Sequence, residues 1–303
     1  MGLALTSAMA AGLLTGCATN SAPRADLSAS RAEAALAKGK TNNAVEHAEA
    51  AVLAEPRNAA YRAMLGTAYL DAGRFASAAA TFDDAMKLGD SSTRTALSLA
   101  LALDGQGKYQ EASALLRDWE SQIAPADLGL AYALSADPAR GIEVLSNAIR
   151  GGENTPKMRQ NLAYAYALAG RFREARLMAA QDVPANLVGS RMEEWAQMAQ
   201  AQAWQTRVAA LVGAPAGVAD AGQPVQLALA NNPSVEQLAT EAAAYAAPKL
   251  AANDTPAAMP QPAASHELAP LDQAAPQVAV ASYPAPQTAE PDNFQAAVAT
   301  IAP

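Results

Sequence analysis

The sequence predicts an all-α protein made of repeated pairs of helices, and three observations lead to this prediction. Turns of glycine followed by a basic residue recur 34 residues apart, at Gly39, Gly73 and Gly107, and return at Gly170. Alanine follows these turns at regular offsets and accounts for 82 of the 303 residues. Only 6 of the 19 prolines lie before residue 213. A fixed period of this length with small residues in phase is typical of a stacked helical repeat array.

The N-terminus is expected to be a processing signal. Residues 1–23 carry no charged side chain, and a short apolar run ends in Leu14-Thr15-Gly16-Cys17, which contains the only cysteine of the chain. The run is too short to span a bilayer and has the length of a signal-peptide core. It resembles a bacterial lipobox, although no basic residue precedes Arg24. The alternative is a buried helix that contains a free cysteine.

The lipobox resemblance implies that residues 1–17 form a lipoprotein signal peptide, that Cys17 is lipidated and that residues 18–24 are a tether. Ala18 follows the cysteine. A residue other than aspartate at that position implies sorting to the outer membrane, with the protein facing the periplasm.

Five repeats are expected, and the second shows the pattern best. Leu65-Gly66 and Tyr69 precede its turn, and Ala78, Phe82 and Ala85 follow it. This spacing resembles the tetratricopeptide repeat, which implies a right-handed superhelix of helix-turn-helix units. The alternative is an alanine-rich bundle without repeat symmetry. The repeats are assigned to residues 25–58, 59–92, 93–126, 122–155 and 156–189, so that the third and fourth overlap near Pro125.

A C-terminal capping helix is expected over residues 186–212, because Met192, Trp195, Met198 and Trp204 recur at roughly helical spacing. Residues 213–303 contain 13 prolines and one basic residue against eight acidic ones. Few large apolar residues are present to offset the entropy of ordering. We therefore expect a disordered acidic tail that contributes nothing to folding.

The composition argues against several classes of function. Residues 1–212 carry 20 basic and 21 acidic side chains, a poor balance for binding nucleic acid. One cysteine and two histidines do not suffice for a structural metal site, and no nucleotide-binding or catalytic motif is present. We expect a protein that is not an enzyme and that has no cofactor, no metal and no small-molecule substrate.

What remains is a binding surface for proteins. The tetratricopeptide resemblance implies that the first helix of each repeat lines a concave face. Positions 2, 6 and 9 of the repeats would project there, among them Ser30, Glu33, Met64 and Thr67. The side chains expected to contact an extended peptide of a partner are Arg94, Ser98, Leu101, Lys157, Asn161 and Tyr164. The alternative is a solvated inner surface.

A lipobox followed by tetratricopeptide repeats resembles outer-membrane lipoproteins of bacterial envelope assembly, in particular those of tight-adherence (Flp) pilus assembly. This resemblance implies a scaffold, lipid-anchored in the outer membrane, whose partners are envelope proteins or peptide segments of them. The proline-rich tail resembles linkers that join such repeats to a peptidoglycan-binding sporulation-related domain. A cell-wall-associated protein whose binding module is missing or divergent is therefore the alternative function.

Overall fold

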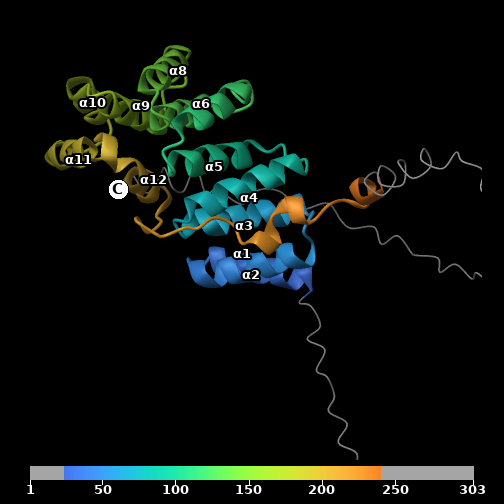
Figure 1. Cartoon of the computed structure of the whole chain (residues 1–303). Helices are drawn as coiled ribbons and strands as arrows, with labels where there is room; N and C mark the ends of the chain where they lie inside the picture. The colour runs from blue at the N-terminus through green and yellow to red at the C-terminus, as the bar shows by residue number, and fades with distance from the viewer. Residues whose placement is uncertain (1–23, 240–303) are drawn as a thin grey trace, which may run out of the picture.

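The computed structural model describes residues 24–239, and within that range all regular structure is helical (Figure 1). The predicted signal peptide, Cys17, the tether up to residue 23 and the tail beyond residue 239 lie outside the described residues. None of the described helices is long and apolar enough to cross a membrane.

Ten helices form five consecutive pairs, and each helix packs mainly on its partner and on the next pair. The pairs are α1 (Ala25–Leu36) with α2 (Thr41–Ala54), α3 (Ala59–Asp71) with α4 (Phe75–Lys87), α5 (Thr93–Asp104) with α6 (Tyr109–Asp118), α7 (Pro125–Leu134) with α8 (Pro138–Arg150), and α9 (Pro156–Leu168) with α10 (Phe172–Ala179). The predicted all-α superhelix of helix-turn-helix repeats is confirmed.

The turn between the two helices of a repeat needs one residue with a positive φ angle. Glycine supplies it in four repeats, with φ between 61° and 74° at Gly39, Gly73, Gly107 and Gly170. In the fourth repeat, whose turn lacks this glycine, Ala136 takes this conformation at φ 57°. A left-handed conformation costs a residue with a β-carbon about 1–2 kcal/mol.

Replacing Ala136 with glycine is therefore expected to raise the free energy of unfolding by about 0.5–1 kcal/mol, after the greater entropy loss of glycine is subtracted. Chemical denaturation of the full chain measures the change. The matched control is Ala80→Gly, at an exposed position inside α4, which should lower stability by about 0.5–1 kcal/mol. A loss of stability in both variants would contradict the strain assigned to Ala136.

Small residues allow the helices of a pair to pack closely. A β-carbon added to Gly66 on α3 would lie 2.6 Å from the ring of Phe82 on α4. In the fourth pair, a β-carbon on Gly141 of α8 would lie 2.4 Å from the carbonyl oxygen of Gly129 on α7. Ala78 and Ala85, both signature positions of the second repeat, are fully buried. The inter-helix distance thus depends on these residues having little or no side chain.

The junction between the third and fourth repeats is irregular. Helix α6 ends at Asp118, so the two repeats do not overlap, and α6 contacts α7 less than α4 contacts α5. Part of the link is a buried hydrogen bond of 2.9 Å from Ser135 to Asp104. Burial raises the pKa of Asp104 well above its usual range, although the Ser135 hydrogen bond and the charge of Arg207 act in the opposite direction.

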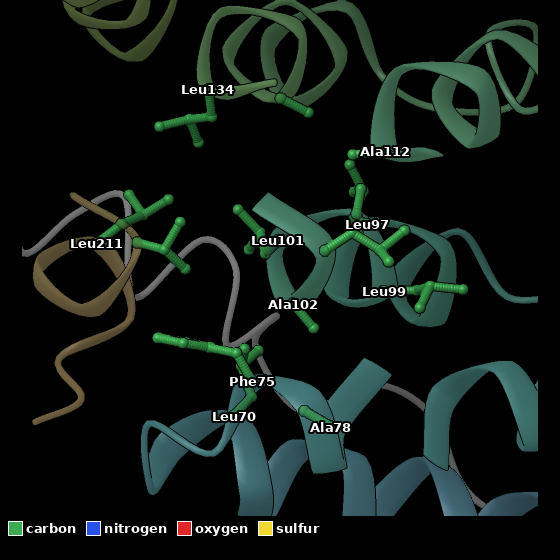
Figure 2. Close-up of a cluster of buried hydrophobic side chains, with 14 of the residues drawn as sticks. Leu70, Phe75, Ala78, Leu97, Leu99, Leu101, Ala102, Ala112, Leu134 and Leu211 are labelled. Carbon is green, nitrogen blue, oxygen red and sulfur yellow. The ribbon is translucent and has the colours of Figure 1, made fainter. Parts of the chain in front are cut away.

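The expected single capping helix is two helices. Helix α11 (Ala185–Met198) covers α9 and α10, and after a short 3-10 turn α12 (Trp204–Val212) packs against α5. The helix breaks because Gln200 is extended, and Arg207 donates to the freed carbonyls of Met198 and Gln200. Figure 2 shows Leu211 of α12 pointing toward Leu101 of α5 within the common core.

The prediction that the chain is unstructured from residue 213 onward is wrong for residues 213–232. This segment, which we call the strap, returns from α12 to the first two repeats and includes two 3-10 turns, Val225–Leu227 and Leu229–Asn231 (Figure 1). Leu227 is 2% exposed. Specific hydrogen bonds to α4 and one buried leucine order a segment whose average composition predicts disorder.

Candidate partner-binding surface

A hollow of about 690 Å³ opens on the face formed by the first helices of the first three repeats. We call this the first-helix hollow. Its polar lining comprises Ser30, Glu33, Thr67, Arg94, Thr95 and Ser98. Its apolar lining comprises Ala34, Leu36, Ala37, Ala63, Met64 and Phe82. Phe82 belongs to α4, and Ala37 directly follows α1. All the other lining residues lie on α1, α3 or α5.

The hollow exists because small side chains line its walls. Alanines at 34, 37 and 63 leave the space between α1 and α3 open. Phe82 reaches the hollow from α4 because Gly66 offers no side chain in its path. The Thr67 hydroxyl group donates to the carbonyl of Ala63, 3.1 Å away. Its oxygen can still accept a hydrogen bond from a ligand.

Hydrogen bonds at the start of α5 position Arg94 and Ser98. The hydroxyl oxygen of Ser92 accepts from the backbone N–H of Thr95 at 3.2 Å and caps the helix. The Thr95 hydroxyl group donates to Asp90 at 2.7 Å and ties the preceding loop to the same turn. Arg94 is exposed and Ser98 half-buried, and a spacing of four puts both on one side of α5. These two predicted site residues therefore line the hollow together.

Three of the six predicted partner-contacting residues are buried inside the protein instead. Leu101 is 2% exposed because α12 packs over α5. Asn161 is 4% exposed and donates to the carbonyl of Ala126 at 2.9 Å, which joins the fourth and fifth repeats. Tyr164 lies against the ring of Trp195, with the ring centroids 5.4 Å apart. These side chains hold the repeats and the cap together.

Lys157 is not brought to the hollow either. Its ammonium group lies 2.8 Å from a carboxylate oxygen of Asp127, in an ion pair between α9 and α7. The expected groove running from Arg94 to Lys157 is therefore limited to the first three repeats. The positions that sequence reasoning placed on the first two repeats, Ser30, Glu33, Met64 and Thr67, do line it.

The hollow has the chemistry of a peptide-binding surface. Hydroxyl groups can bond to a peptide backbone, Met64 offers apolar contact, and Arg94 and Glu33 carry opposite charges. Within residues 24–239, no group of three or more histidine, cysteine, aspartate or glutamate side chains is placed to hold a metal ion.

Comparison with protein families supports the repeat fold. Residues 37–119 match the family model described as "Anaphase-promoting complex, cyclosome, subunit 3", a family of tetratricopeptide-type repeats. The matched range runs from the end of the first repeat's first helix to the end of α6, and so includes α3 and α5 of the hollow. Comparisons with curated proteins and with solved structures yield no match. The fold is consistent with a tetratricopeptide-type helical repeat, a fold that generally serves protein–protein interaction.

Proposed function

We propose that this protein is a membrane-anchored, non-catalytic scaffold that binds an extended segment of a protein partner in the first-helix hollow. The observation that carries the proposal is the hollow itself, a polar and apolar recess on a repeat fold that serves protein–protein interaction. Its lining holds hydroxyl groups, one charge of each sign and the apolar side chains of Met64 and Phe82. Such a surface fits a micromolar affinity, near −8 kcal/mol.

The location we propose is the outer membrane, with the repeats facing the periplasm and Cys17 carrying the lipid. The charge-free N-terminal segment that ends at the only cysteine supports this proposal. Partners are then proteins of the bacterial envelope, and a pilus or secretion complex under assembly is the setting that the lipoprotein resemblance favours.

Replacing Ser98 with tryptophan is expected to lower recovery of the partner at least about tenfold, because the indole ring occupies the hollow. In-cell crosslinking of the full chain, followed by mass spectrometry of the captured proteins, measures the recovery. The matched control is Ser190→Trp, the same substitution at an exposed position of α11. The melting temperature of each variant is measured alongside, so that loss of fold is distinguished from loss of binding. Full recovery with a folded Ser98→Trp protein would rule out the hollow as the binding site.

Replacing Cys17 with serine is expected to move the protein from the membrane fraction to the soluble periplasmic fraction. A lipid-modified N-terminal cysteine with several acyl chains anchors stably, whereas one chain alone binds only marginally. Fractionation of cells that express either form measures the change. Membrane association that persists in the Cys17→Ser variant would contradict the proposed anchor.

A further inference from the structure

The strap, residues 213–232, lies along α4 and is bonded to the first two repeats at both ends. At one end, Asp220 accepts hydrogen bonds from the backbone N–H of Ser77 at 2.8 Å and from its hydroxyl group at 2.6 Å. At the other end, the N–H of Leu229 donates to Asp84 at 3.3 Å, and Arg57 donates to the carbonyl of Asn232 at 3.0 Å. The partners in these bonds are 143 to 175 positions apart in the sequence.

The start of α4 is built to receive a carboxylate. The first turn of a helix leaves backbone N–H groups without partners, and Arg74, at the cap position, provides no side-chain cap. Asp220 supplies the missing acceptor, and its carboxylate lies 3.6 Å from the Arg74 guanidinium group. Burial would raise the pKa of Asp220, but the two bonds from Ser77, the N–H of Gly222 and the charge of Arg74 together lower it.

The surface of α4 between these two contacts is also polar and covered. Ser77 and Thr81 are fully buried, although their side chains are polar and lie on one side of the helix, one turn apart. The strap is bonded at Ser77 and again at Asp84, and Thr81 lies between these two positions on the helix. The first 3-10 turn of the strap also contacts α2. The surface of α2 and α4 on which the strap lies is called here the second-helix groove.

A buried arginine fixes the position of the Asp84 carboxylate, which contacts the strap. Arg62 of α3 has no exposed side-chain surface and donates to Asp84 at 2.9 Å and to the carbonyl of Pro56 at 2.7 Å. The same oxygen of Asp84 accepts from the backbone N–H of Leu229. An acceptor fixed in this way recognises a backbone N–H, here that of Leu229, and not a particular side chain.

The strap is held less firmly than the helices beneath it. Of its large apolar side chains, only Leu227 is buried, Val218 and Leu229 are half-buried, and Val225 is 75% exposed. Its regular structure is two 3-10 turns of three residues each. Segments with few buried apolar contacts and isolated hydrogen bonds open at a lower free energy than the core they cover.

We propose that the second-helix groove is a second peptide-binding site, and that the strap is its resident ligand, which a partner displaces. The partner segment carries a carboxylate and, seven residues later, a leucine, as Asp220 and Leu227 do. The partner segment continues at least two residues beyond the leucine, so that Asp84 can accept from its backbone as it accepts from the N–H of Leu229. This site is separate from the first-helix hollow, which lies on α1, α3 and α5.

A second copy of this chain is a poorer occupant than a partner. Only seven residues separate Val212, the end of α12, from Asp220, so the strap of the same chain reaches the groove at a high effective concentration. The strap of another molecule has the same contacts without that advantage. A partner segment that makes further contacts elsewhere on the protein can outcompete the strap of the same chain despite its high effective concentration.

The test uses the full chain and a fluorescent peptide that spans residues 216–233. In the receptor variant Asp220→Asn/Leu227→Ala the strap is loosened but present. We expect this variant to bind the peptide with micromolar affinity, and the wild-type chain to bind it at least about tenfold more weakly because its own strap competes. Peptides carrying either the Asp220→Asn or the Leu227→Ala change should each bind at least about tenfold more weakly. Adding Ser98→Trp to the receptor should change nothing.

Equal binding of the peptide to wild-type and loosened chains would overturn the proposal, since the groove would then not be the site. Hydrogen exchange of the wild-type chain provides a measurement that needs no variant. The amides of residues 218–232 should exchange at least about tenfold faster than those of α3 and α4, and exchange at the same rate would make the strap a permanent part of the fold. Wild-type dimers that the peptide dissociates would also overturn the partner assignment, in favour of a strap from a second copy.

Discussion

Replacing Trp195 with alanine is expected to lower the free energy of unfolding by about 3–5 kcal/mol. The side chain is 1% exposed in α11 and packs on Tyr164 of the last repeat. Its indole nitrogen has no hydrogen-bond partner among the described residues, so the loss is one of packing. Chemical denaturation of the full chain, followed by circular dichroism, measures the difference.

The control is Leu177→Ala on α10, at a side chain that is 65% exposed. A change at a surface position of this kind is expected to stay within about 0.5 kcal/mol. Similar losses at the two positions would mean that α11 does not seal the last repeat. The loss of Trp195 should also speed hydrogen exchange in α9 and α10, which α11 covers.

Replacing Gly141 with alanine is expected to lower the free energy of unfolding by about 1–3 kcal/mol. The new β-carbon would lie 2.4 Å from the carbonyl oxygen of Gly129 and 3.1 Å from the β-carbon of Ala133. Because the first of these atoms belongs to the backbone, no side-chain rotation relieves the clash. Helices α7 and α8 have to move apart, which opens the packing of the whole fourth repeat.

Gly189→Ala is the matched control, since the same substitution in α11 meets nothing within 4 Å. Alanine favours a helix over glycine, so this variant should gain up to about 1 kcal/mol. Opposite signs for the two variants are the expected result. A gain at both positions would show that α7 and α8 do not pack as closely as described.

The repeat fold was accessible from the sequence because its signals are local and periodic. The Gly73 and Ala78 pair of the second repeat recurs as Gly39 and Ala44 in the first repeat and as Gly107 and Ala112 in the third. The same rule correctly placed Arg94 and Ser98 beside the hollow, because the first three repeats follow regular spacing there. Local periodicity therefore predicted the array of helix pairs. It also predicted the part of the surface that no segment outside the repeats covers.

The errors arise where distant segments return onto the repeats. Tyr164 and Leu101 occupy positions that a free repeat array would expose, and α11 and α12 cover them. Asp220 and Leu227 lie in a segment rich in proline and alanine, and its average composition predicts disorder and does not single out these two residues. What orders this segment is the uncapped start of α4, which no local pattern around residue 220 reveals. Their partners could be identified only from the folded structure.

The separation of 143 residues between Ser77 and Asp220 also has a consequence for synthesis. At roughly 5–20 residues per second, the ribosome adds Asp220 about 7–30 seconds after Ser77. Neighbouring repeats can stack during this interval, because each needs only its neighbours. Once α4 has formed, and until Asp220 follows, its first turn lacks this acceptor. The nascent chain therefore passes through a stage with an open second-helix groove, in which a segment from another protein meets no competition from the strap.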